Sequence, residues 1–130
     1  FTFDLLVRSL NEKSLAIKGT KISVLGLAYK GDIDDCRESP SFEIIKLLEE
    51  KGADVDVYDP YVLGKSTVQT LGDALDGAQA VIIATPHSEF KKITANVLQK
   101  HGVGLVVDGR NCLDKKAFLQ SGLRYLGIGR

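Results

Sequence analysis

Lys30 and Arg37 are the cations of one segment, GLAYKGDIDDCRESP, and they are the residues there that could hold an anionic ligand. The segment follows a short apolar run, where a phosphate-binding turn would stand. The three positions of a GxGxxG fingerprint are occupied by Gly26, Ala28 and Gly31. Alanine stands where the middle glycine would let the backbone approach a pyrophosphate, so the fingerprint fails. A phosphate bound here would need long cationic side chains.

Acidic residues surround these two cations. Asp32, Asp34 and Asp35 stand too close to a phosphate site to line it, so we expect them to face away, bracing Arg37 or capping turns. Glu38 would favour the following helix N-terminus through the helix dipole. The alternative interpretation is that the whole segment is a solvated charged turn.

Three other loops could add ligand-binding groups. Arg110, in VVDGRNC, follows a glycine that lets the chain turn, so the guanidinium could hold a phosphate or sugar, or form a surface salt bridge. Asp59, in VYDPY, stands where dinucleotide folds place their ribose-binding acid, but Asp-Pro also opens turns, which is the favoured interpretation. His87 could polarise a ligand or cap the helix after it.

The elements that must position these residues alternate between strand and helix. Strands are predicted in KISVLGL, DVDVYDP, AVIIAT, VGLVVDG and LRYLGI, and helices in SFEIIKLLEEKG, around Ala95–Lys100 and in LDKKAFLQSG. Ser39 is the expected N-cap of the first of these helices and Pro40 its first residue. In that helix Ile44, Ile45, Leu47 and Leu48 are expected to form one buried stripe. Continuous apolar strands indicate a parallel sheet covered on both faces. The fold class is therefore α/β, a Rossmann-like doubly wound parallel sheet in three layers, with ligands at the carboxyl ends of the strands.

Composition excludes several classes of function. Seventeen basic residues balance seventeen acidic ones in 130 residues, so no overall field draws the chain to nucleic acid or anionic lipid. No stretch is long and apolar enough to cross a membrane. The two cysteines and two histidines lack metal-binding or disulfide spacings, which predicts no metal site and a reducing, cytoplasmic location.

The N-terminal residues have a helical period without a capping residue. Apolar residues recur from Leu5 to Ile17, and Lys18-Gly19-Thr20 would end the helix. This pattern predicts a chain that starts inside a longer helix, either because a longer protein was cut there or because a natural end frays.

The segment GLAYKGDIDDCRESPSFEIIKLLEEKGADVDVYDPYV, with GAQAVIIATPHSEFK and VVDGRNCLD, resembles the C-terminal domain of the UDP-glucose/GDP-mannose dehydrogenase family. These enzymes oxidise a sugar CH2OH to a carboxylate with two NAD molecules. The resemblance implies that residues 1–19 are the tail of the central linking helix and residues 20–130 the UDP-binding domain. The DDCRESPS form is more similar to members acting on UDP-N-acetylhexosamines than on UDP-glucose.

The resemblance also implies roles for individual residues. Tyr29 and Lys30 would contact the nucleotide and diphosphate of a UDP-sugar, Arg110 would hold the substrate near its sugar and phosphates, and Arg37 would reach the NAD bound by the N-terminal half. Neither Cys36 nor Cys112 matches the family's nucleophile motif, so no catalytic residue is expected in this chain. The expected partners are the substrate, the N-terminal NAD domain and, for the full enzyme, a second subunit in a homodimer.

Two other readings of the sequence make different predictions. A stand-alone NAD-binding regulatory domain would bind NAD better than UDP, although Ala28 and the long first loop oppose it. A signalling receiver domain would use Asp34 and Asp35 as a metal pair, Asp59 as phosphoacceptor and Thr85 as the switch hydroxyl. It also needs a lysine where the chain has Asp108-Gly109-Arg110.

Overall fold

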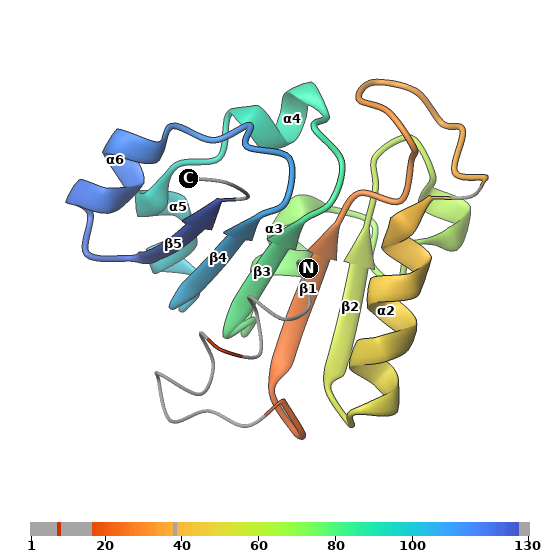
Figure 1. Ribbon diagram of the computed structural model, residues 1–130, viewed down its shortest axis with the longest axis horizontal. Helices are drawn as coiled ribbons and strands as arrows, with labels where there is room; N and C mark the ends of the chain where they lie inside the picture. The colour runs from red at the N-terminus through yellow and green to blue at the C-terminus, as the bar shows by residue number, and fades with distance from the viewer. Residues whose placement is uncertain (1–7, 9–16, 38, 128–130) are drawn as a thin grey trace.

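A five-stranded, wholly parallel sheet forms the centre of the molecule (Figure 1). The structure is a computed structural model that describes residues 8, 17–37 and 39–127. The strand order is β2-β1-β3-β4-β5. The strands are β1 (Lys21–Leu25), β2 (Asp54–Tyr58), β3 (Ala80–Ile83), β4 (Leu105–Asp108) and β5 (Arg124–Gly127). Each begins and ends within one of the predicted apolar runs, which confirms the strand assignments.

Helices cover both faces of the sheet, as the predicted three layers require. The helices are α2 (Pro40–Glu50), α3 (Leu71–Leu75), α4 (Ser88–Lys91), α5 (Ala95–Lys100) and α6 (Lys115–Gln120), with a 3-10 turn η1 (Leu63–Lys65). Helix α2 packs on one face, and α3 to α6 pack on the other. The sequence pattern did not predict η1.

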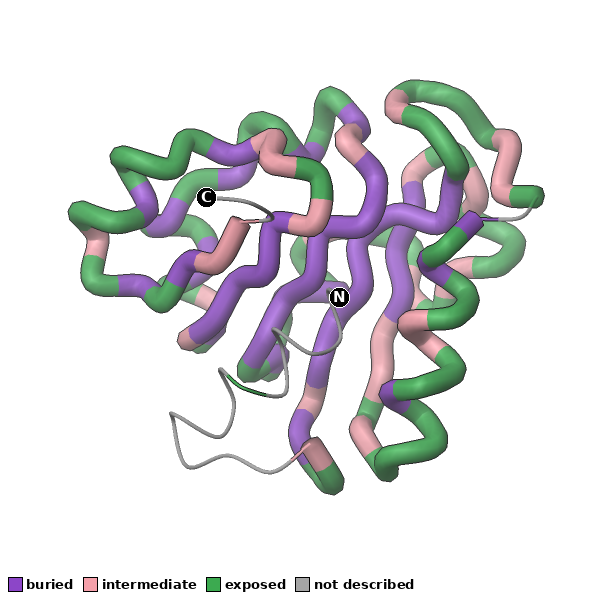
Figure 2. Tube along the Cα trace, in the orientation of Figure 1, coloured by how far each residue is buried: buried purple, intermediate pink, exposed green. Residues whose placement is uncertain are grey.

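Alternation along the strands explains the two layers of core. In β3, Ala80 and Ile82 pack with Leu48 of α2, whereas Val81 and Ile83 pack with the helices of the opposite face. Successive strand side chains point to opposite faces, so an uninterrupted apolar strand fills both cores at once. Figure 2 shows β1, β3 and β4 buried along most of their length and the outer sides of the helices exposed.

Strand order reverses between β1 and β3, and this reversal selects one place at the sheet edge. The connection from β1 leads outward to β2, and the chain then returns across β1 to β3. Because right-handed crossovers running in opposite directions lie on opposite faces, the loops after β1 and β3 face each other at the carboxyl edge.

The structure contradicts one sequence prediction, the burial of Leu47. Leu47 was expected in the buried stripe of α2, but it is 37% exposed, whereas Leu48 is fully buried. The stripe of α2 is thus narrower, with Ile44 and Ile45 packing beside Leu48. The predicted N-terminal helix lies almost wholly outside the described residues. No helix in the described part of the chain could span a membrane.

Candidate functional site at the carboxyl edge of the sheet

Four loops converge where the strands end, as the parallel sheet requires. They are residues 26–39 after β1, 59–62 after β2, 84–87 after β3 and 109–114 after β4. Tyr29, Lys30 and Arg37, predicted to contact substrate or NAD, lie on the first of these loops, and Arg110 lies on the last.

The predicted substrate residues are exposed on these loops. Tyr29 is 50% exposed, and Lys30 and Arg110 are also exposed. Arg110 and Gly109 line a hollow together with the carboxyl end of β3. Pro40 and Ile44, at the start of α2, line its other side. Tyr29 and Lys30 do not line that hollow. The structure thus places the three residues at one edge of the sheet, and their joint contact with one ligand remains a prediction.

Arg37 is presented to solvent by a neighbouring carboxylate. Its Nε donates to Asp35 Oδ1 and its Nη2 donates to Asp35 Oδ2, both at 3.1 Å. The Arg37 side chain is 87% exposed. Side-chain and backbone hydrogen bonds from Arg37 lower the pKa of Asp35, and the same pair raises the pKa of the guanidinium. An exposed pair adds little stability, so the pairing orients Arg37 without burying it. The expectation that an acidic neighbour braces Arg37 is confirmed.

The two fingerprint glycines allow one loop to pack on another. Gly26 has φ +107°, and a Cβ there would lie 2.4 Å from Thr85 Oγ1. A Cβ on Gly31 would lie 2.5 Å from the carbonyl oxygen of Pro86. Thr85 Oγ1 also donates a hydrogen bond of 2.7 Å to the Ala28 carbonyl. These glycines therefore allow close contact between the loops after β1 and β3.

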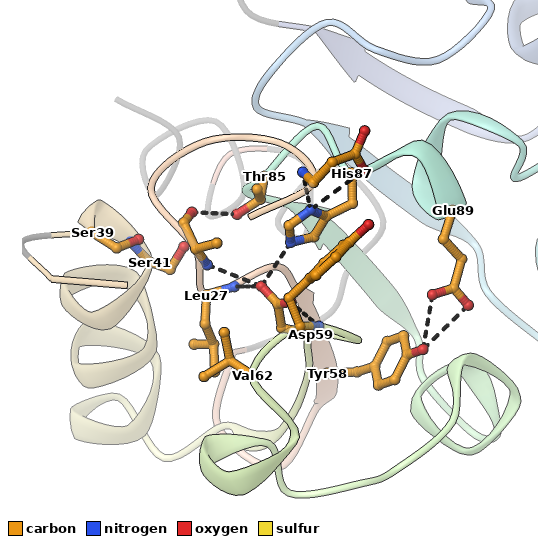
Figure 3. A network of polar contacts seen from close by, with 12 residues as sticks. Leu27, Ser39, Ser41, Tyr58, Asp59, Val62, Thr85, His87 and Glu89 are labelled. Atoms are coloured by element: carbon orange, nitrogen blue, oxygen red, sulfur yellow. Dashed lines mark hydrogen bonds and ion pairs between the residues drawn. The ribbon is translucent and has the colours of Figure 1, made fainter. Parts of the chain in front are cut away.

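Asp59 is fully buried and its carboxylate is surrounded by donors (Figure 3). Oδ2 accepts from the backbone N–H groups of Leu27 at 2.7 Å and Ala28 at 2.9 Å, and Oδ1 accepts from Tyr61 N–H at 2.8 Å. His87 Nε2 lies 2.9 Å from Oδ2. Burial acts to raise the pKa of Asp59, but these hydrogen bonds outweigh it and lower that pKa. The carboxylate holds loops together, so it is unavailable for a ribose or as a phosphoacceptor.

His87 occupies the N-cap position of α4, but its side chain makes no capping hydrogen bond. Asp32 caps the helix instead, accepting from Ser88 N–H at 2.8 Å and from Ser88 Oγ at 2.6 Å. The His87 ring is buried between Asp59 and the backbone N–H of Asp32, 2.8 Å from Nδ1. The helix-capping interpretation of His87 is therefore wrong for its side chain, because the ring turns inward.

Asp108 positions Arg110 in the way that Asp59 positions the first loop. Its buried carboxylate accepts from the backbone N–H groups of Arg110 at 3.3 Å, Cys112 at 3.1 Å and Leu113 at 2.9 Å. Tyr125 Oη also donates to it, at 2.9 Å. The carboxylate winds the loop after β4 around itself and directs Arg110 outward.

The cysteine of the same loop is unsuited to nucleophilic chemistry. Burial and the Asp108 carboxylate raise the pKa of the Cys112 thiol to about 12, so very little thiolate forms near neutral pH. The expectation that Cys112 is not a catalytic thiol stays a prediction. Both cysteines are free. The described residues contain no group of three or more His, Cys, Asp or Glu side chains that could hold a metal ion.

The N-terminus of α2 opens beside the hollow. Ser39 is the N-cap, its side chain accepts from Ser41 N–H at 3.3 Å, and Pro40 is the first helical residue, as predicted. Helix N-termini attract anions through unpaired N–H groups and the helix dipole. Glu38, expected to interact with this end, lies outside the described residues.

A family model covers most of the chain. Residues 23–115 match the UDP binding domain of the UDP-glucose/GDP-mannose dehydrogenase family. This range contains every predicted site residue and all four loops of the carboxyl edge.

Curated relatives and solved structures agree with this match. UDP-N-acetyl-D-mannosamine dehydrogenase of Pyrococcus horikoshii is 36% identical over 100% of this chain, and its solved structure has a TM-score of 0.91. NDP-N-acetyl-D-galactosaminuronic acid dehydrogenase of Methanosarcina mazei is 31% identical over 99% of the chain, with a TM-score of 0.93. UDP-glucose 6-dehydrogenase of Rhizobium meliloti is 35% identical over 88%. The chain spans 28 to 30% of the length of these proteins.

Proposed function

Because the chain belongs to the UDP-glucose/GDP-mannose dehydrogenase family, as its UDP binding domain, we propose that it binds the UDP part of a nucleotide-sugar. The complete enzyme would oxidise the sugar CH2OH group to a carboxylate. Two NAD molecules, held in turn by the rest of the enzyme, would supply the hydride-accepting chemistry, and water the second carboxylate oxygen. The contribution of this chain is to bind and orient the substrate.

Lys30 and Arg110 are the proposed diphosphate ligands. Both are exposed at the carboxyl edge, and each stands on a loop whose backbone is fixed by a buried carboxylate, Asp59 or Asp108. The guanidinium can form paired hydrogen bonds with phosphate oxygens, and the ammonium supplies a mobile point charge. Tyr29 stands beside Lys30, half-exposed, where its ring can contact the nucleoside. The observation that carries the proposal is that Lys30, on the loop after β1, and Arg110, on the loop after β4, are both exposed at the carboxyl edge of the sheet.

The loops at the carboxyl edge of this chain do not form an NAD site by themselves. A dinucleotide needs close backbone approach and a free ribose-binding acid, whereas Gly26 packs against Thr85 and Asp59 is occupied by four donors. Arg37 is the residue that we propose contacts NAD, from a loop that holds it in solvent. The NAD domain and the nucleophilic cysteine would belong to the remainder of the enzyme.

The proposal also covers the sugar substrate, the location and the oligomeric state of that enzyme. The relatives act, by name, on UDP-N-acetyl-D-mannosamine and on UDP-glucose, and the DDCRESPS form favours an N-acetylated sugar. The two free cysteines fit a reducing cytoplasm. A homodimer is the proposed state of the complete enzyme.

Calorimetric titration with UDP, UDP-glucose, UDP-N-acetylglucosamine and NAD tests the binding proposal. We expect weak binding of the UDP compounds and negligible binding of NAD. Lys30→Ala and Arg110→Ala should each weaken UDP binding about ten-fold or more, the loss of one charge-assisted hydrogen bond. Lys100→Ala, at the end of α5, is the matched control. UDP binding that survives both substitutions at the edge would contradict the assignment, and preferential NAD binding would favour a regulatory NAD domain.

A further inference from the structure

The loop after β1 is fixed on both sides of the residues proposed to bind substrate. Before Tyr29 and Lys30, the backbone N–H groups of Leu27 and Ala28 donate to Asp59 Oδ2. After them, the backbone N–H of Asp32 donates to His87 Nδ1 at 2.8 Å. The exposed stretch between these two anchors is therefore short, and its path depends on where the anchors lie.

One imidazole ring joins the two anchors. His87 is fully buried, its Nε2 lies 2.9 Å from Asp59 Oδ2, and its Nδ1 faces the Asp32 N–H (Figure 3). The ring also packs against Tyr61 and Phe90, with centroid distances of 4.8 Å and 5.5 Å. It cannot turn freely in this space, so its two nitrogens keep their separate partners.

The partners determine the protonation state of the ring. A backbone N–H donates to Nδ1, so Nδ1 must carry a lone pair. The carboxylate of Asp59 accepts from Nε2, so Nε2 must carry the proton. His87 is therefore the neutral tautomer with hydrogen on Nε2.

We infer that His87 is a positioning residue that, as this neutral tautomer, sets the path of the loop carrying Tyr29 and Lys30 and thereby the affinity for UDP-sugars. The part about affinity rests on the proposed function, whereas the part about loop position does not. Neither a structural core role nor the helix cap explains why both nitrogens bond to the two anchors of one exposed stretch.

Protonation of His87 would disrupt the second anchor. Nδ1 would become a donor facing another donor, the Asp32 N–H. The groups that face the ring are Asp59, Asp32, whose Oδ1 lies 4.0 Å from Nδ1, and the ring of Tyr61, while Lys91 of α4 lies near Asp32. The Asp32 carboxylate would then compete for the new proton against its bonds to Ser88. A protonated ring would therefore loosen the stretch between the anchors.

Two substitutions separate the functions of the two nitrogens. His87→Asn keeps an oxygen acceptor near the position of Nδ1, which can serve the Asp32 N–H and cannot be protonated. His87→Gln reaches the position of Nε2 and can donate to Asp59, but it leaves the Asp32 N–H without its acceptor. His101→Gln is the matched control, because His101 also pairs with a carboxylate, Asp76.

The experiment measures UDP-glucose affinity at about pH 8, together with hydrogen exchange of the Asp32 amide. We expect His87→Gln to weaken binding about ten-fold and to accelerate Asp32 exchange by a similar factor. His87→Asn should bind within about three-fold of the natural chain, because its oxygen can accept from the Asp32 N–H. His101→Gln should change neither quantity.

Every outcome decides the inference. Unchanged affinity and unchanged Asp32 exchange in His87→Gln would overturn it, as would equal losses of affinity in both His87 variants. If the natural chain binds no UDP-glucose, the proposed function fails, and Asp32 exchange in the two variants alone decides whether His87 positions the loop. If both variants fail to fold, nitrogen chemical shifts of His87 in the natural chain decide it, because hydrogen on Nδ1 near pH 8 would refute the tautomer.

Discussion

Asp59 and Asp108 perform the same task at the ends of two strands. Each is fully buried, and each accepts backbone N–H groups from the loop that follows its strand. A buried carboxylate is tolerated only when such donors replace its hydration. Both side chains therefore fix the loops that carry ligand-binding candidates, and neither is a ligand-binding candidate itself.

Replacing Asp59 tests this task. Asp59→Asn removes the charge and points an amide N–H2 group toward donors, so we expect a loss of about 3 kcal/mol in the free energy of unfolding at pH 7. Urea unfolding monitored by circular dichroism measures it. Asp54→Asn, at the exposed start of β2, is the control and should change that free energy by less than about 0.5 kcal/mol.

The effect of Asp59 should also depend on pH. Its native pKa is lowered, so its stabilisation is fully present above the unfolded value of about 3.9 and is lost as the pH falls through the lower native pKa. The difference between the natural chain and Asp59→Asn should therefore shrink when unfolding is measured at successively lower pH below about 4. A difference that grows on acidification would refute the assignment of a charged, hydrogen-bonded Asp59.

Residue chemistry that depends on distant partners could not be predicted. The sequence identified Lys30, Arg37 and Arg110 because exposed cations in edge loops are a local signal. The contact of His87 with Asp59 and Asp32 joins residues far apart in the chain, and no local spacing encodes it. The one available signal was that Asp59 and His87 both follow strands of a parallel sheet, whose ends meet at one edge.

At the scale of elements, the loop after β1 is defined by its contact with the loop after β3. Gly26 lies against Thr85, Gly31 lies against Pro86, and Asp32 caps α4. The loop is long, yet its backbone is fixed at several points by partners outside it. An exposed tyrosine and lysine can thus stand on a well-ordered frame.

Gly26→Ala should damage this frame. Its φ of +107° is unfavourable for alanine, and the added Cβ would lie 2.4 Å from Thr85 Oγ1, so we expect a loss of about 3 kcal/mol or more in the free energy of unfolding. Gly72→Ala is the control, because that glycine lies in α3 with no atom within 4 Å of the new Cβ. It should be neutral or stabilising by up to about 1 kcal/mol in the same urea experiment. Equal effects of the two substitutions would show that the contact between the loops is unimportant.

Periodicity predicted the main elements because β1, β3 and β4 are buried on both faces and α2 on one. It predicted less about short elements. The 3-10 turn η1 is three residues long, too short to show a period. The burial of Leu47 was predicted wrongly, because a helical stripe alone does not say how wide a surface the sheet presents to α2.

At the scale of the whole molecule, the reversal of strand order determines where binding can occur. It brings the loops after β1 and β3 together beside the end of β4, whatever residues they carry. The formal net charge of the chain is zero, so attraction for an anionic ligand must come from the cations of these loops. The fold class and this edge could be predicted from the sequence. The joint orientation of Lys30 and Arg110 could not, because it depends on loop conformation.

A crystal structure of the chain with UDP-glucose bound tests the central claim most directly. We predict that the diphosphate lies at the carboxyl edge with Lys30 Nζ and the Arg110 guanidinium both within about 3 Å of its oxygens. A diphosphate bound elsewhere, or held at this edge by backbone N–H groups with both cations turned away, would contradict it.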